Sequence, residues 1–313
     1  MSKKSKLYPD NKDGIYMYEY PLINGIKQYV QIRGISRNNP LVLFVHGGPG
    51  SSVAGLCDEV QKGWEDNYTV VNWDQRNTCK TYLANQEKAE EISENSSLSD
   101  YISDIDGVIE YLHSVYEFDK IYLVGFSWGS LIGAEYIRRY PQKVMKYIGI
   151  GQFVNMCGGI QAVCEQLIEC AEKDSPKDVE KIKGIMERCS DVHDMTKGFE
   201  RDLRSMTMLG MKYIMKNGKS LPYSKILFSP YMNFKEKRSF FSSNLENNKS
   251  AFKILLNADF REDMNFQVPV LFVFGDEDTN CPPRLIQDCF DEINAPEKKL
   301  SVIENAAHCC FYD

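Results

Sequence analysis

The sequence lacks the features that would place the chain in a membrane or on nucleic acid. No apolar run approaches the roughly 18 residues that a membrane-spanning helix needs, and the basic start, residues 1–9, is not followed by the apolar segment of a secretory signal. Basic residues are spread along the chain, whose formal net charge is −7, so nucleic acid is not an expected partner. We therefore predict a soluble, cytoplasmic protein with no membrane or nucleic-acid partner.

Signs of disulfide pairing and of metal binding are also scarce. The ten cysteines include no CxxC pair, and in a chain without a secretory signal they are expected to stay reduced. Cys189 and His193 lie one helical turn apart, but no second pair stands near them, so a surface helix position is the better interpretation. We predict neither a metal nor a cofactor.

The N-terminal part of the chain carries a clear strand pattern. Residues 15–20 and 28–33 form two alternating runs on either side of the turn signal Asn24-Gly25, which predicts an antiparallel hairpin at the edge of a sheet. The continuous apolar run at 41–45 predicts a strand buried on both faces, and residues 70–73 predict a further short strand.

Helices and strands alternate in the next part of the chain. Apolar residues at helical spacing predict a helix over 98–116, with Ser99 as its N-cap. A strand that stops at Gly125, a helix that runs to Arg139 and a strand over 144–150 follow. This alternation is typical of a mainly parallel sheet.

The middle of the chain has a different character. Residues 151–259 are rich in Glu, Lys and Met at helical spacing and contain no buried-strand run, which predicts a mostly helical insertion. The strand pattern returns at 268–274 and ends at 300–303. We therefore predict an α/β fold in which residues 1–150 and 260–313 form the core and 151–259 form a helical cap.

The most informative motif is Gly-Phe-Ser-Trp-Gly at 125–129, between a strand-like run and a helix-forming run. A lone serine between two glycines at such a junction is typical of a nucleophile elbow, because strand and helix can approach only where side chains are missing. The pentapeptide is short enough to be an incidental glycine-rich turn, so the prediction depends on partners elsewhere in the chain.

A serine nucleophile needs a general base, and the chain has only four histidines. His308 follows the last predicted strand on a loop of small residues, where it can overhang the strand ends, and we predict it to be the base. His113 lies within a predicted helix, His193 lies in the insertion, and His46 is expected to shape the glycine-rich loop that follows it.

The acid that orients this histidine is expected after the preceding strand, where residues 275–278 read Gly-Asp-Glu-Asp. We predict Asp278, with Asp276 as the alternative, because a turn that begins with glycine directs the later carboxylate across the strand ends. The chain order Ser127, Asp278, His308 is the order found in α/β-hydrolases.

Two backbone N–H groups are predicted to bind the oxyanion of the reaction. One belongs to Trp128, at the start of the helix that follows the nucleophile. The other belongs to Gly48, in the loop 46–50 that reads His-Gly-Gly-Pro-Gly. Because this loop follows a buried strand and is rich in glycine, its backbone can approach a substrate closely.

These motifs together resemble the proline iminopeptidase branch of the α/β-hydrolases, peptidase family S33. The resemblance is carried by HGGPG at 46–50, WDQR at 73–76, GFSWGS at 125–130, GDED at 275–278 and His308. It implies a serine hydrolase that uses a Ser-Asp-His triad and an acyl-enzyme, without metal or cofactor. It also implies release of an N-terminal residue, typically proline, from small peptides or amino-acid amides, with acidic cap residues that hold the free α-amine.

The chain departs from this family in the loop after WDQR and in the cap. Members follow WDQR with two glycines, whereas residues 77–81 here read Asn-Thr-Cys-Lys-Thr; Asn77 can adopt the left-handed conformation of a glycine, and Cys79 could narrow the site. All three tryptophans lie in the predicted core, so the cap lacks those that accompany the family's amine-binding glutamate. The candidate carboxylates are Glu165, Glu169, Glu172 and Glu200.

Two other functions stay open on the sequence. A small ester, lactone or other acyl compound is the alternative substrate, and a catalytically silent module that binds a ligand or partner is the alternative to an enzyme. The chain stops five residues after His308, although α/β-hydrolases usually add a final helix there. An uncovered sheet face would favour association, so a homo-oligomer is a possible state. Cys309 and Cys310 are expected to be packing residues.

Overall fold

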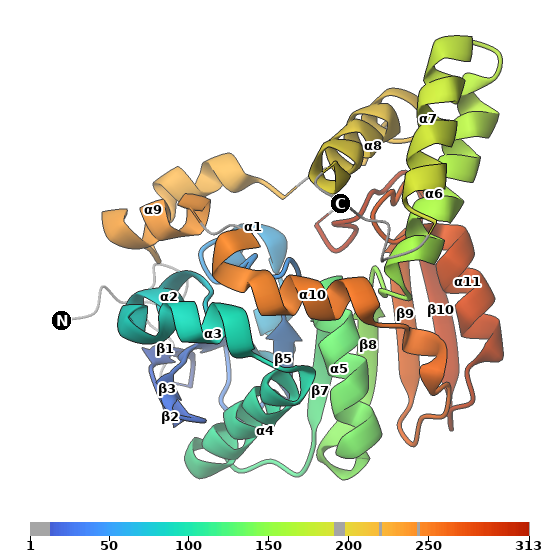
Figure 1. The fold of residues 1–313 in the computed structure, drawn as a ribbon. Helices are drawn as coiled ribbons and strands as arrows, with labels where there is room; N and C mark the ends of the chain where they lie inside the picture. The colour runs from blue at the N-terminus through green and yellow to red at the C-terminus, as the bar shows by residue number, and fades with distance from the viewer. Residues whose placement is uncertain (1–12, 191–197, 219–220, 243–244, 313) are drawn as a thin grey trace.

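The computed structural model describes residues 13–190, 198–218, 221–242 and 245–312. Eight strands form one sheet in the order β1-β4-β6-β5-β7-β8-β9-β10 (Figure 1). The strands from β5 to β10 run parallel to one another, β4 pairs antiparallel with β6, and β1 pairs antiparallel with β4. The bounds are β1 Ile15–Glu19, β4 Tyr29–Gly34, β5 Leu41–Val45, β6 Thr69–Asp74, β7 Ile121–Phe126, β8 Val144–Ile150, β9 Val270–Gly275 and β10 Lys298–Ile303. The predicted fold class is therefore confirmed.

The predicted N-terminal pairing is confirmed, although its turn has a different place. β1 pairs with β4 antiparallel, with Ile15 opposite Gly34. The turn at Asn24-Gly25 closes a separate small ribbon between them, made of β2 (Leu22–Ile23) and β3 (Ile26–Lys27). Asn24 has a φ of 49° and Gly25 a φ of 80°, which is the left-handed geometry that such a turn requires.

Helices α4 (Leu98–Val115), α5 (Trp128–Arg139) and α11 (Pro283–Glu292) cover one face of the sheet. The predicted N-cap of α4 was wrong, because Ser97 and not Ser99 caps the helix. The Ser97 hydroxyl accepts the Asp100 N–H at 3.3 Å, and the Asp100 carboxylate accepts the Ser97 N–H at 2.7 Å. This capping box satisfies two helix-end donors at once.

The opposite face is covered by shorter elements, which include α1 (Cys57–Val60), η1 (Trp64–Asp66) and the turns at the C-terminal end. The Phe311 ring lies 5.6 Å from the Phe44 ring and 4.9 Å from the Phe126 ring, centroid to centroid. Cys309 and Cys310 are buried in the same cluster. The end of the described chain therefore packs under the strand that carries the serine motif.

The helices between β8 and β9 are called the inserted helices here. They are α6 (Met156–Ala171), α7 (Pro176–Arg188), α8 (Phe199–Tyr213), η5 (Tyr223–Phe228), α9 (Phe234–Ser242), η6 (Leu245–Asn248), α10 (Lys249–Asn257) and η7 (Phe260–Glu262). In Figure 1, α6, α7 and α8 rise above the strand ends at the right of the view, and α9 lies at the left. A separate apolar cluster joins α6, α7 and α8, whereas Ala251 and Leu255 of α10 pack into the main core.

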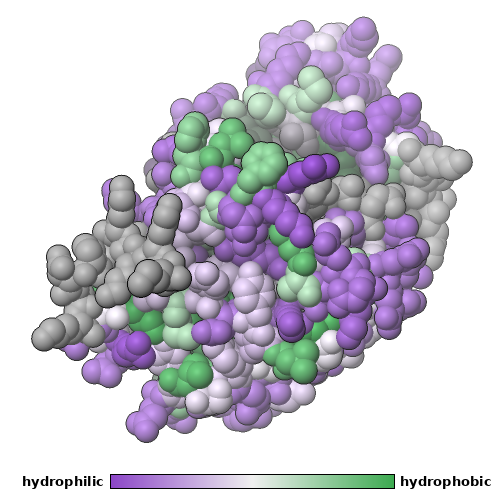
Figure 2. All heavy atoms as spheres, turned by 90° about the vertical axis from the view of Figure 1, so that its left-hand side faces the viewer, coloured by the Kyte–Doolittle hydropathy of each residue, from purple (hydrophilic) through white to green (hydrophobic). Residues whose placement is uncertain are grey.

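The remaining short helices are α2 (Cys79–Ala84), η2 (Gln86–Lys88), α3 (Ala89–Asn95) and η3 (Pro141–Lys143). None of the described helices combines the length and the apolarity that crossing a membrane requires. Viewed from the side of α9, the surface is mostly hydrophilic and carries separate hydrophobic patches (Figure 2). Phe228 and Phe234, each 83% exposed, are among the exposed aromatic residues.

Candidate active site

Ser127 lies between the end of β7 and the start of α5, in the turn that the sequence motif predicts. Its φ of 54° and ψ of −119° are rare for a residue with a side chain. A Cβ atom on Gly125 would lie 2.5 Å from the Gly129 carbonyl oxygen, and one on Gly129 would collide with the Val45 carbonyl oxygen. Both glycines are therefore required for the close approach of strand and helix.

His308 and Asp278 meet at the carboxyl ends of the parallel strands. His308 Nδ1 lies 2.8 Å from Asp278 Oδ2. Asp278 is 1% exposed, and its Oδ1 accepts the N–H groups of Asn280 and Cys281 at 2.8 and 2.9 Å. A buried carboxylate needs such donors to remain ionised. The contact directs Nδ1 to the carboxylate and leaves Nε2 for a hydroxyl group.

The alternative acid has a different partner. Asp276 Oδ1 accepts the Ala306 N–H at 3.2 Å, so this carboxylate holds the loop that carries His308 and does not contact the imidazole. Of the two candidate aspartates, the structure brings Asp278 to the histidine.

Gly48 lies beside Ser127, since it lines both cavities that contain the serine. Its φ is 116°, and a Cβ atom there would lie 2.6 Å from the Gly50 nitrogen, so only glycine fits. Trp128 is the first residue of α5, where a backbone N–H has no acceptor within its own helix. Both predicted oxyanion donors therefore belong to backbone that borders the serine.

Gln75 connects these two segments, and the sequence did not single it out. Its Oε1 accepts the Trp128 indole N–H at 2.8 Å, and its Nε2 donates to the His46 carbonyl oxygen at 2.8 Å. One side chain thus fixes the elbow helix to the loop that carries Gly48. The only sequence signal for this role is the position of Gln75 within the WDQR motif.

His46 shapes the glycine-rich loop, as its position suggested. Its Nε2 accepts the Gln75 N–H at 3.3 Å, and its Nδ1 lies 2.8 Å from the Gly47 carbonyl oxygen. Burial lowers the pKa of His46 to about 4, so the ring is neutral at pH 7 and Nδ1 is the protonated nitrogen. His46 is thus a structural histidine.

His113 contacts a different part of the chain. His113 stacks on Phe118 with ring centroids 3.9 Å apart. Cys189 is buried at the end of α7, and His193 lies outside the described residues. Within the described parts of the chain, no group of three His, Cys, Asp or Glu side chains could hold a metal ion.

Two cavities of about 260 Å³ each meet at Ser127. The first, named the helix lobe, has mostly apolar walls: Phe153, Met156, Ile160, Leu203, Met206, Phe252, Leu255 and Cys281, with Asn155 and Gly159. The second, named the histidine lobe, is lined by Ser51, Phe126, Met215, Leu221, Tyr223, Ala307, His308 and Cys309. Five residues border both lobes: Gly48, Ser127, Thr207, Thr279 and Asn280.

Cys281 is the neighbour of Ser127 in the helix lobe, and no sequence motif marked it. Burial raises the pKa of the Cys281 thiol, as does the charge of Asp278, while a hydrogen bond with the Ser127 side chain acts in the opposite direction. The nucleophile candidate therefore has a neutral thiol beside it.

The four glutamates considered for amine binding line neither lobe. All four are exposed, and two of them have salt-bridge partners at 3.2 Å, Glu165 with Arg284 and Glu200 with Arg204. Glu169 lies on the solvent face of α6 with Glu165, and Glu172 caps the end of that helix. Among the described lining residues of the helix lobe there is no carboxylate.

The loop that departs from the family pattern contacts the inserted helices. Asn77 has a φ of 54°, the left-handed conformation expected for it, and its Nδ2 donates to the Asn247 carbonyl oxygen at 2.8 Å. Cys79 is 2% exposed and lines neither lobe, so it does not narrow the site. Lys80 Nζ donates to the Tyr231 carbonyl oxygen at 2.7 Å.

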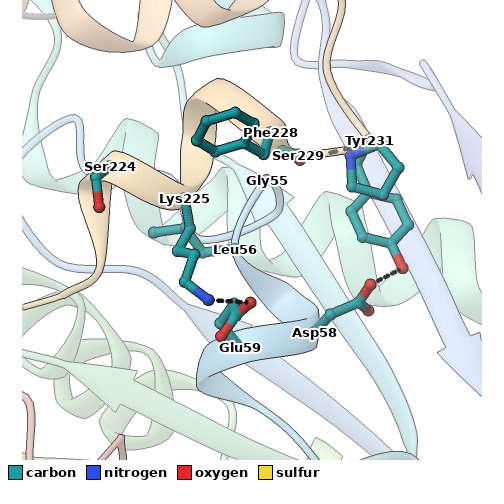
Figure 3. Close-up of a pocket in the computed structure, with 10 residues that line it drawn as sticks. Gly55, Leu56, Asp58, Glu59, Ser224, Lys225, Phe228, Ser229 and Tyr231 are labelled. Carbon is teal, nitrogen blue, oxygen red and sulfur yellow. Dashed lines mark hydrogen bonds and ion pairs between the residues drawn. The ribbon is translucent and has the colours of Figure 1, made fainter.

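A third cavity, of about 510 Å³, does not contain Ser127. It lies between α1 and the segment around η5, and its charged groups are paired (Figure 3). Lys225 Nζ lies 3.1 Å from Glu59 Oε1, and the Tyr231 hydroxyl donates to Asp58. This cavity is therefore separate from the chemistry at Ser127.

Comparison with known proteins shows the family of the chain. Residues 40–198 match a family model described as alpha/beta hydrolase fold. The "Probable aminopeptidase YbaC" of Bacillus subtilis (strain 168) is 26% identical over 304 residues, 96% of this chain and 93% of that protein. A proline iminopeptidase of Neisseria gonorrhoeae is 26% identical over 166 residues, 48% of this chain and 49% of that protein.

A solved structure, an esterase (EaEST) from Exiguobacterium antarcticum, superposes with a TM-score of 0.57 at 19% identity. The match covers 94% of this chain and 92% of that chain. At this identity the similarity concerns the fold alone.

Proposed function

The chain belongs to the α/β-hydrolase family, and on this basis we propose that it is a serine hydrolase with Ser127 as its nucleophile. The observation that carries the proposal is the 2.8 Å contact between His308 Nδ1 and the buried Asp278. Ser127 is the only serine with a positive φ among the described residues, and it lines the same cavity as His308. A hydroxyl group, a base and an orienting acid are the three parts that acyl transfer requires.

In the proposed reaction, Ser127 Oγ attacks a carbonyl carbon while His308 Nε2 takes the hydroxyl proton. The N–H groups of Gly48 and Trp128 stabilise the tetrahedral oxyanion. His308 then gives the proton to the leaving group, and the acyl-enzyme forms. Water, activated by the same imidazole, releases the acyl group, while Asp278 stabilises the charged ring in both steps.

The leading substrate class is a small peptide or amino-acid amide with a free N-terminus. The support is the match to the Bacillus aminopeptidase over nearly its whole length, together with a helix lobe of suitable volume for one apolar residue. A specific observation favours a second class, esters with an uncharged acyl group: no carboxylate lines the helix lobe among the described residues. A buried ammonium group without a charged partner is costly.

The nucleophile is tested with a fluorophosphonate probe. Wild-type protein should be labelled, and Ser127→Ala should not be labelled. Undiminished labelling of the variant would refute the assignment of Ser127.

The substrate class is tested with matched pairs of apolar aminoacyl anilides, each with a free or an acetylated amine, and with the corresponding acyl esters. Turnover that needs the free amine supports the aminopeptidase. Turnover that survives acetylation supports the ester hydrolase. If wild-type protein is not labelled and turns over none of these substrates, the chain is a binding module and the proposal fails.

A further inference from the structure

The three consecutive acidic residues after β9 have three different partners. Asp276 holds the loop before His308, and Asp278 holds His308 itself. Glu277, 9% exposed, turns toward the inserted helices. Its Oε2 accepts the N–H groups of Asn217 and Gly218 at 2.9 and 2.8 Å. These two residues follow the end of α8.

The 217–218 stretch also directly contacts residues 304–308, which are called the histidine loop here. A Cβ atom on Gly218 would collide with the backbone nitrogen of Ala307, so the two backbones are in close contact. Asn217 Nδ2 donates to Asn305 Oδ1 at 3.1 Å. Glu277 completes the arrangement through its own backbone, whose N–H donates to the Ala306 carbonyl oxygen at 2.9 Å.

This contact lies next to the wall of the histidine lobe. Met215, two residues before the clamped stretch, lines that lobe, as do Leu221 and Tyr223 farther along the chain. In acyl transfer the base that takes the serine proton returns it to the leaving group. The leaving group must therefore lie within reach of His308, in the histidine lobe, and the acyl group lies in the helix lobe.

We propose that Glu277 is a positioning residue that clamps residues 217–218 onto the histidine loop and thereby sets the size of leaving group that the histidine lobe accepts. The inference rests on the proposed serine-hydrolase function.

The charge of Glu277 suits this role. Burial raises the pKa of its carboxyl, but the N–H groups of Asn217, Gly218 and Lys216 outweigh the burial, and the net pKa is lowered. The group is therefore ionised at neutral pH, where its bonds to backbone N–H groups are strongest.

The test compares leaving groups of similar acidity and different size on one acyl group, namely phenyl and 2-naphthyl esters, or anilides and 2-naphthylamides if a free amine is required. Glu277→Ala should raise the ratio of kcat/KM for the naphthyl over the phenyl substrate by about 10-fold, because two charge-assisted hydrogen bonds are lost. The deacylation rate should change little, since no leaving group is present in that step.

Two further variants separate the clamp from a general effect on folding. Glu277→Gln should keep the wild-type ratio, because both N–H groups bond to a single oxygen that the amide can supply. Gly218→Ala should raise the ratio as Glu277→Ala does, because its methyl group displaces the stretch from Ala307. Glu304→Ala, an exposed acidic residue on the same loop, is the matched control and should leave the ratio unchanged.

The clamp would be overturned if the naphthyl-to-phenyl ratio of kcat/KM stayed unchanged in both Glu277→Ala and Gly218→Ala. An equal loss of kcat/KM on both substrates counts as such an unchanged ratio. Fluorophosphonate labelling of Ser127 is measured on every variant. If the wild-type protein is not labelled, the serine-hydrolase proposal is refuted. If labelling is normal and the naphthyl-to-phenyl ratio of kcat/KM is unchanged in the variants, only the clamp is refuted.

Discussion

Asp74 and Asp278 lie at the carboxyl ends of β6 and β9, and both residues are 1% exposed. Asp278 accepts two backbone N–H groups and contacts His308. Asp74 accepts the Ser52 hydroxyl and the Lys80 N–H, the latter at 3.1 Å, and burial raises its pKa to about 6. Burial at a strand end is thus common to both carboxylates. What distinguishes Asp278, the carboxylate proposed to act in catalysis, is that its second oxygen contacts a histidine.

The largest expected effect concerns Asp278. Asp278→Asn should lower kcat by about 10³–10⁴-fold, because a neutral amide no longer stabilises the charged imidazole and favours the wrong ring tautomer. Asp74→Asn should keep kcat within a few-fold of wild type. Steady-state kinetics of both variants on the best substrate gives the comparison, and equal losses in the two would contradict it.

The next effect concerns the pH dependence of the free energy of unfolding that arises from Asp74. The pKa of Asp74 is raised from about 4 in the unfolded chain to about 6 in the fold, so the folded state binds its proton more tightly. The contribution of the protonated Asp74 to the free energy of unfolding is fully present below about pH 4 and is lost as pH rises through 6. The difference between the two pKa values corresponds to ~3 kcal/mol of this free energy.

Asp74→Asn removes this dependence, because an amide does not titrate and can still meet both donors. The free energy of unfolding of the variant, relative to wild type, should therefore rise between pH 4 and pH 7. Urea unfolding at several pH values measures it. A constant difference across that range would show that Asp74 is ionised throughout.

The titration of His46 changes the free energy of unfolding in the opposite direction over the same pH range. Because its pKa is lowered to about 4, the unfolded chain binds its proton more tightly, and the stabilisation from the neutral ring is lost as pH falls below about 6.5. Removal of Asp74 should therefore leave a protein that is more sensitive to acid than wild type.

The smallest effect concerns Asp276. Asp276→Ala loses the hydrogen bond to the Ala306 N–H, worth about 1 kcal/mol, so kcat should fall a few-fold through a less well-held histidine loop. Asp276→Asn should restore kcat, because its amide oxygen can accept the same bond. A loss as large as that of Asp278→Asn would mean that the roles of the two aspartates are reversed.

The sequence predicted the parts of the site that depend on local pattern. Ser127 and Gly48 follow from glycine spacing, and His308 from its place after the last strand. The sequence favoured Asp278 over Asp276 from the glycine that begins the turn, and in the structure Asp278 is the carboxylate that contacts the imidazole. Gln75 was missed because its role arises from contacts with residues far away in the chain.

The inserted segment is helical as predicted, but the four glutamates considered for amine binding do not line the lobes. Glu165 and Glu169 lie on one face of α6, opposite the buried Val163 and Leu167, and Glu172 caps the end of the helix. That spacing is the signature of a solvent face, and it was present in the sequence. The docking of the helices on the core, which decides what reaches Ser127, depends on packing between distant segments and could not be predicted.

The loop at 77–80 has a consequence for engineering. Asn77 and Lys80 bond to carbonyl oxygens at positions 247 and 231, on segments that belong to the inserted helices. The loop and the insertion therefore form one exchangeable module, although the bonded residues lie 151 and 170 positions apart in the sequence. A chimera that received the inserted helices without this loop would lose both of these hydrogen bonds, so a successful graft must transfer both pieces together.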